Sequence, residues 1–266
     1  LALVALSLLG NSATRNHNAI YDAAACDAFG YTTVTTASRG TYCGSFTQPA
    51  SRSISNKFNN WAGYTSGTFD INDSTQLFGS LSYYDSEATS SSGTEFWGTS
   101  GDRFTRTPTG AATGYFYDPR YNDYFQLQRV FNPFELGGNE AASTVYNERN
   151  YDVTFGVNGL FGDRFDWELS GNYGKYEYES DRPRLLAKAV HDYFLGPQLG
   201  NLANGVPIYK LNLDRWNTPI TPEIYQSFAT RAVTESETSS ATVNFNVAGD
   251  LFELPAGPVG FAAVME

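Results

Sequence analysis

The sequence predicts an all-β fold of antiparallel hairpins, and three observations support this prediction. Aromatic residues make up 15% of the 266 residues and glycine occurs 25 times, a composition typical of strands and turns. Several segments alternate apolar and polar residues with a period of two. Between these segments, short connections alternate with long ones along the chain.

The clearest hairpin covers residues 151–173. Apolar side chains such as Phe155 occupy odd positions of its first arm, and polar ones such as Asp152 occupy even positions. After a three-residue turn the pattern resumes, with Trp167 odd and Glu168 even. Such a pattern on both sides of a tight turn predicts two paired strands with one apolar and one polar face.

Two further hairpins have the same organisation. Residues 58–69 and 75–86 flank a turn of Asp, Asn and Ser, and residues 241–251 and 259–263 flank a Pro-Ala-Gly-Pro turn. The apolar segment Leu1–Leu9 is interpreted as a seventh strand. A clipped signal-peptide core and a buried core segment are the two alternatives.

The connections predict an environment for these strands. Short connections lie at 70–74, 162–164 and 252–257, and long ones at about 11–57, 87–147 and 179–233. Structureless loops beyond about 15 residues are uncommon in soluble domains. Outer-membrane barrels, in contrast, combine short periplasmic turns with long extracellular loops. The sequence therefore predicts a portion of an antiparallel transmembrane β-barrel with about seven strands, an incomplete barrel because bacterial single-chain barrels close with an even number.

Composition excludes other classes of protein. The formal charge of −11 argues against a nucleic-acid surface, which needs clustered Lys and Arg. An apolar run of about 18 residues is absent from the sequence, which excludes a membrane-spanning helix. The mean hydropathy of −0.36 does not exclude membrane strands, because these need apolar residues only at alternate positions.

Catalytic and metal-binding motifs are not predicted. Cys26 and Cys43 lack the spacing and histidine partners of a zinc site, so we expect a loop-closing disulfide formed in an oxidising compartment. Asp70 to Asp73 are interpreted as a turn instead of a calcium loop. Asp166 and Glu168 are interpreted as solvated charges instead of a glycosidase pair. We expect no enzyme activity and no cofactor.

Two segments resemble a known family. Residues 69–79 (FDINDSTQLFG) and 254–262 (LPAGPVGFA) are similar to strand–turn–strand units of the TonB-dependent receptors, the active importers of scarce nutrients. Membership would imply an outer-membrane barrel of about 22 strands with a plugged lumen. The chain departs from this pattern, since it has too few strands and no plug-like segment. Residues 1–266 are therefore expected to be part of a single barrel domain, with the plug outside this chain.

The resemblance also implies partners and a location. These are outer-membrane lipid, the TonB complex reached through the plug, and a siderophore, saccharide or peptide ligand, in the outer membrane of a Gram-negative bacterium. The alternatives are a passive porin-like barrel and a secreted β-sandwich binding protein.

The connection 179–233 is the predicted ligand-capture loop. Helical spacing predicts helices over Arg184–Leu195 and Thr221–Ala229. Aromatic rings can stack on a ligand and guanidinium groups can pair with its carboxylates. The alternative is that the aromatic residues only pack the loop. The ligand-contact candidates are Tyr193, Tyr209, Trp216, Arg182, Arg184 and Arg215.

Overall fold

The computed structural model describes residues 3–7, 21–37, 40–46, 50–99, 114–162 and 164–266. The fold is mostly β, with 60% of residues in strands and mainly antiparallel pairing, as expected from the sequence. The strands form two separate sheets, which the sequence did not predict. Within the described ranges these sheets do not close into a barrel. The chain divides into two compact units. Unit 1 comprises 1–56, 90–144 and 182–232, and unit 2 comprises 57–89, 145–181 and 233–266.

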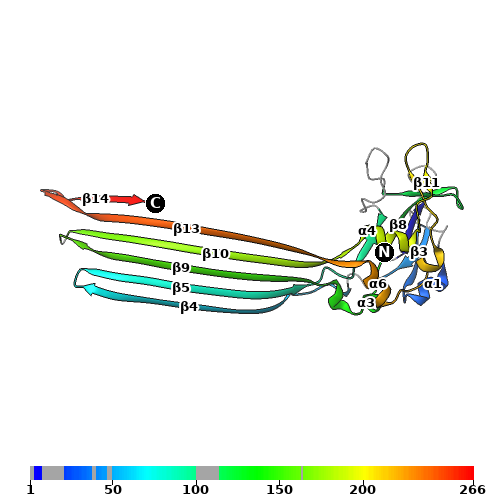
Figure 1. Ribbon diagram of the computed structural model, residues 1–266, viewed down its shortest axis with the longest axis horizontal. Coiled ribbons are helices and arrows are strands. Elements are labelled where there is room, and N and C mark those ends of the chain that lie inside the picture. The colour runs from blue at the N-terminus through cyan, green and yellow to red at the C-terminus, as the bar shows by residue number, and fades with distance from the viewer. Residues whose placement is uncertain (1–2, 8–20, 38–39, 47–49, 100–113, 163) are drawn as a thin grey trace. The chain divides into compact units, whose positions relative to one another are not determined.

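Unit 2 is built on a six-stranded antiparallel sheet in the order β14-β13-β10-β9-β5-β4 (Figure 1). Its strands form the three predicted hairpins, and most are longer than the alternation indicates. Their bounds are β4 Lys57–Asn72, β5 Thr75–Ser90, β9 Thr144–Phe161, β10 Phe165–Leu185, β13 Ala229–Leu254 and β14 Gly257–Met265.

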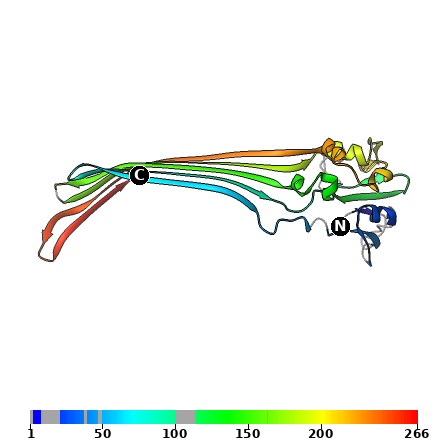
Figure 2. The same cartoon turned by 90° about the horizontal axis from the view of Figure 1, so that it is seen from below.

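Local chemistry fixes the hairpin turns. Asn72 accepts the backbone N–H of Ser74 at 2.9 Å, and Gly162 has a positive φ of 61° that favours glycine. The register of β13 against β14 shifts between Asp250 and Phe252. A bulge of this kind bends a strand. Figure 2 shows the β13–β14 hairpin bending away from the other strands of the sheet near its turn.

Unit 1 contains an eight-stranded sheet in the order β11-β12-β7-β8-β1-β3-β2, with β6 also paired to β8. Short helices and a cluster of buried side chains accompany it. The strands are β1 Leu3–Ser7, β2 Thr32–Thr36, β3 Gly40–Gly44, β6 Phe96–Gly98, β7 Phe116–Asp118, β8 Asp123–Val130, β11 Gly200–Asn201 and β12 Pro207–Ile208. The helices are α1 Ala23–Ala28, α3 Pro133–Leu136, η3 Asn139–Ala142, α4 Ala187–Phe194, α5 Leu213–Trp216 and α6 Pro222–Phe228.

The interpretation of Leu1–Leu9 as a seventh barrel strand is wrong. Its described part, β1, lies between β8 and β3 in the sheet of unit 1, with Leu3 opposite Arg129 and Cys43. The long-strand sheet therefore has six strands. The physical reason lies in the residue pattern. An uninterrupted apolar run is typical of a strand in a sheet that is covered on both faces, whereas a strand with one apolar and one polar face alternates with a period of two.

The predicted disulfide is confirmed. Cys26 in α1 and Cys43 in β3 are bonded, with their Cα atoms 5.3 Å apart, and both are buried. Closing a loop of this length stabilises a fold by about 3 kcal/mol in the chain-entropy model.

Both predicted helices are present. Helix α6 begins after Thr221, whose hydroxyl accepts the N–H of Ile224, and Pro222 occupies its first turn. Helix α4 buries Val190 and Phe194, two of the residues that recur at helical spacing.

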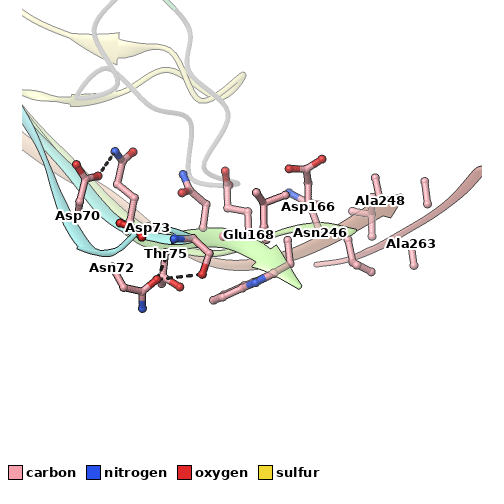
Figure 3. Close-up of a pocket in the computed structure, with 18 residues that line it drawn as sticks. Asp70, Asn72, Asp73, Thr75, Asp166, Glu168, Asn246, Ala248 and Ala263 are labelled. Carbon is pink, nitrogen blue, oxygen red and sulfur yellow. Dashed lines mark hydrogen bonds between the residues drawn. The ribbon is translucent and has the colours of Figure 1, made fainter. Parts of the chain in front are cut away.

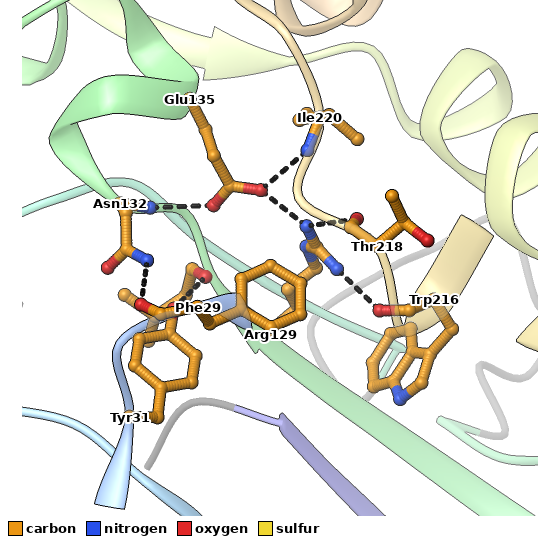
Figure 4. Close-up of polar contacts among 9 residues, drawn as sticks. Phe29, Tyr31, Arg129, Asn132, Glu135, Trp216, Thr218 and Ile220 are labelled. Carbon is orange, nitrogen blue, oxygen red and sulfur yellow. Dashed lines mark hydrogen bonds and ion pairs between the residues drawn. The ribbon is translucent and has the colours of Figure 1, made fainter. Parts of the chain in front are cut away.

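A buried ion pair joins distant segments of unit 1 (Figure 4). The Arg129 guanidinium of β8 donates to Glu135 of α3 at 2.5 Å and to the carbonyl of Trp216 at 2.7 Å, and both charged side chains are fully buried. Glu135 also accepts the backbone N–H groups of Asn132 and Ile220 at 2.8 and 3.0 Å. Burial lowers the pKa of Arg129, and Glu135 opposes this shift. These hydrogen bonds offset the cost of desolvating both charges.

We predict that Arg129→Met lowers the free energy of unfolding by about 3–5 kcal/mol, because it leaves the Glu135 carboxylate buried without its partner. Adding Glu135→Gln should recover part of this loss. Urea unfolding of the full chain, followed by tryptophan fluorescence, measures both effects. Arg215→Met, at an exposed arginine of the same unit, is the control. Equal losses for Arg129→Met and Arg215→Met would contradict the assigned role.

Candidate functional site

The six-stranded sheet has two chemically different faces. Odd-numbered residues of β5, β9, β10 and β13 share one face. The glycines show which residues of neighbouring strands share a face. A Cβ added to Gly79 of β5 would lie 3.8 Å from the Phe155 side chain of β9, and one added to Gly249 of β13 would lie 2.6 Å from the Phe165 side chain of β10. Many apolar side chains on this face are open to solvent, with Phe155 61% and Phe161 73% exposed. We call the following set the apolar band: Leu77, Leu81, Val153, Phe155, Val157, Phe161, Phe165, Trp167, Leu169, Phe245 and Val247.

A tyrosine row follows the apolar band along the strands. It consists of Tyr83, Tyr151 and Tyr173 on the same odd face, further from the hairpin turns. The ring of Tyr83 also packs on Trp61 of β4, with centroids 4.7 Å apart. Tyrosine combines an apolar ring with a polar hydroxyl, so it suits a boundary between apolar and aqueous surroundings.

An ion network lies beyond the tyrosine row on the same face. Arg149 of β9 is 3.5 Å from both Asp85 of β5 and Glu177 of β10. Lys175 of β10 is 2.7 Å from Glu177 and 3.1 Å from Glu237 of β13. Exposed pairs of this kind each contribute little to stability, about 0–1 kcal/mol. Together they join four strands and mark this end of the face as a hydrated surface.

The even-numbered residues form a polar face at the level of the apolar band. The Asn172 amide donates to Asp152 at 2.8 Å and to Thr154 at 3.0 Å, which joins β10 to β9. Near the hairpin turns this side of the sheet borders an open cavity of about 890 Å³. Figure 3 shows the carboxylates of Asp70, Asp166 and Glu168 at this cavity, and none of its lining residues is basic.

The aromatic side chain of Phe78 in β5 lies on the polar face. The ring of Phe78 lies over Gly156 so closely that a Cβ there would be 2.3 Å from Phe78 Cζ and 2.9 Å from the carbonyl oxygen of Leu169. Gly156 is therefore required by packing between β5 and β9. In contrast, a Cβ on Gly63 of β4 meets nothing within 4 Å.

We predict that Gly156→Val destabilises the protein by about 1–3 kcal/mol, since the new side chain must displace the Phe78 ring or the backbone. Gly63→Val is the matched control and should change stability little. The urea midpoints of the two variants provide the measurement. A Gly156→Val midpoint equal to that of Gly63→Val would contradict the assigned packing.

The six ligand-contact candidates have different environments in unit 1. Tyr209 and Trp216 are core residues, 1% and 0% exposed, so the packing interpretation holds for these two. Tyr193 is half-buried, and the Arg215 guanidinium lies 4.6 Å from its ring centroid and donates to its carbonyl at 3.0 Å. Arg182 and Arg184 are exposed near the end of β10. The structure thus brings Tyr193 and Arg215 together.

Arg184 acts on a half-buried carboxyl group, that of Glu95, which the sequence did not single out. Burial raises the pKa of Glu95 from its ordinary value of 4.5 to about 7, and the positive charge of Arg184 opposes this shift. Glu95 directly precedes β6, and its carbonyl accepts the N–H of Phe131 at 3.0 Å. Its position was not predictable from sequence, because a single Glu in a polar connection carries no periodic signal.

We predict that the stability of unit 1 falls as the pH rises from about 4.5 to about 7. In this window the folded state binds more protons at Glu95 than the unfolded state, so deprotonation favours unfolding. Glu95→Gln should reduce the slope, and Glu140→Gln, at an exposed carboxyl of the same unit, should not. Urea midpoints measured across this pH range test it, and an unchanged slope in Glu95→Gln would contradict it.

Metal ligands and membrane helices are not found in the part of the chain that the structure describes. It contains no cluster of three or more His, Cys, Asp or Glu suited to hold a metal ion. None of its helices has the length and hydrophobicity to cross a membrane.

Comparison with known proteins does not extend these observations. No protein-family model matches the chain, and no curated protein matches it.

Proposed function

We propose that the six-stranded sheet is part of the wall of an outer-membrane β-barrel, and that the chain belongs to a TonB-dependent receptor that imports a scarce ligand. The main observation behind this proposal is the order of side chains along one face of the sheet. The apolar band is followed by the tyrosine row and then by the ion network, which is the order that lipid, interface and water require.

Strand length supports this proposal. Strand β9 has 18 residues, which at about 3.4 Å per residue reach about 60 Å. The apolar outer band of a transmembrane barrel is only about 25 Å tall. The remaining length would project above the membrane and would carry the ion network there.

The opposite face supports a lumen. In a barrel wall, residues alternate between lipid and the interior, and the interior is polar. The even face carries Asp152, Asn172 and the carboxylates around the open cavity, as an interior filled by water or by a plug needs. Further strands outside this chain would pair with the edge strands β4 and β14, because unpaired backbone groups are costly in lipid.

The long connections favour a receptor over a passive porin-like barrel. They contribute most of unit 1, which has its own buried cluster, a disulfide and a buried ion pair. A packed unit of this kind can hold contact groups for a dilute ligand in fixed positions. The TonB complex would supply energy through a plug outside this chain, in the outer membrane of a Gram-negative bacterium. Uptake that continues unchanged in cells lacking TonB would favour the porin.

A secreted β-sandwich remains the other candidate. It would need a second sheet to cover the apolar band, because two packed sheets bury their facing side chains. Among the described residues, Phe155 and Phe161 stay largely exposed, which favours contact with lipid.

We predict that Val157→Arg in the full-length receptor destabilises the barrel by about 2–4 kcal/mol, because it places a charge in the apolar band at mid-membrane depth. Ser170→Arg is the matched control. Ser170 pairs with Gly156, directly beside Val157, but its side chain lies on the polar face. Unfolding of the receptor in liposomes by urea measures both. Equal effects of the two substitutions would contradict the assigned faces.

A further inference from the structure

A second aromatic surface lies in unit 1, on the connection between β5 and β9. In β7 and β8 the alternation places Phe116, Asp118 and Phe125 inward, where all three are fully buried or nearly so. Three half-buried tyrosines, Tyr115, Tyr117 and Tyr124, accompany them on the other side. Tyr117 and Tyr124 are paired across the two strands. We call these three residues the tyrosine platform.

The rings of the tyrosine platform lie against one another. The centroid of Tyr124 is 5.5 Å from that of Tyr117 and 5.8 Å from that of Tyr115, with interplanar angles of 64° and 82°. Such edge-to-face packing stabilises each ring in one orientation. A ligand would therefore meet preorganised rings and would not have to order them.

Amide side chains from two turns lie at the platform. Asn122 accepts the Tyr117 hydroxyl at 2.6 Å, and Asn204, on the turn between β11 and β12, donates to the Tyr124 hydroxyl at 3.5 Å. Asn122 is the one non-glycine residue with positive φ, 51°, among those described. Residues held in this region cluster at functional sites, although asparagine tolerates it better than most. The turn conformation thus brings an amide to the tyrosine hydroxyl.

The nearby arginine, Arg120, forms an ion pair with Asp118. Arg120 donates through two nitrogens to the carboxylate of Asp118, at 3.1 and 2.6 Å, and also to the carbonyl of Leu211 at 2.6 Å. The identified groups at the tyrosine platform are therefore rings, hydroxyls and amides. The side chains that contact these rings are neutral, whereas an anionic chelate or a peptide carboxylate pairs best with a cation.

We propose that the tyrosine platform is the outer capture site of the importer and that it binds a neutral oligosaccharide. The C–H groups of a sugar ring can pack on the electron-rich faces of tyrosine, while hydroxyls pair with amides that both donate and accept. This inference rests on the proposed function, and it selects the saccharide among the siderophore, saccharide and peptide ligands of that function.

Binding of defined oligosaccharides to the detergent-purified full-length receptor tests the proposal. Isothermal titration calorimetry with maltohexaose, xylohexaose and chitohexaose should show saturable binding of at least one of them. Tyr117→Ala and Tyr124→Ala should each weaken this binding by about tenfold or more, as expected for a buried aromatic contact. Tyr64→Ala, at a 72% exposed tyrosine of unit 2, is the matched control and should bind normally.

A second variant keeps the platform intact. Asn204→Trp, at an exposed turn position, should cover the rings and weaken binding without removing a packed side chain. Heat-modifiable migration of the same samples reports whether the barrel has formed. A correctly formed barrel that binds none of the three sugars, or binds one equally well in all variants, overturns the saccharide proposal alone. Ferric siderophore binding that is lost in Tyr117→Ala and Tyr124→Ala also overturns it. A chain that does not enter the outer membrane contradicts the proposed function instead.

Discussion

The buried guanidinium of Arg129 is the interaction on which unit 1 depends. It connects β8 to α3 through Glu135 and to the segment 216–220 through backbone carbonyls. Its guanidinium also lies about 5 Å from the rings of Phe29, Phe131 and Phe194. A buried charge is stable only when hydrogen-bond partners replace the water that it has lost. The segments that supply these partners to Arg129 must therefore stay close to its guanidinium. The tyrosine platform begins on the same strand, β8, and is held in place by this core.

Unit 2 depends on a different constraint, the alternation of side chains across a pleated strand. A shift of one residue in any pairing would exchange its apolar and polar faces, so the register of each hairpin is strongly specified. The cross-strand ion pairs of Arg149 and Lys175 agree with the same register at the far end of the strands. The close contact between Phe78 and Gly156 adds a steric requirement between β5 and β9. These features favour one sheet in a single register, with the apolar band on one face and polar residues opposite it.

In the proposed importer the two units would have different roles. The sheet would separate lipid from a polar interior, which needs length and alternation but few specific contacts. Ligand capture needs groups fixed in three dimensions, and these come from unit 1, where short strands and turns meet. Two of the six candidates chosen from sequence, Tyr209 and Trp216, belong to the core of this unit. Partly exposed rings lie at Tyr193 of α4, and also at Tyr117 of β7 and Tyr124 of β8.

The sequence by itself determined the hairpins of unit 2, helices α4 and α6, and the pairing of Cys26 with Cys43. Each depends on local information, namely a period of two, a period near 3.6 with a capping Thr221, or a count of cysteines. Only the tertiary structure decided that Leu3–Ser7 belong to unit 1 and that Arg129 is buried with Glu135. It also decided that Tyr117 and Tyr124 share a surface with Asn204. Pairing between segments far apart in the chain leaves no local period, because burial and cross-strand partners are set by the packing of the whole unit.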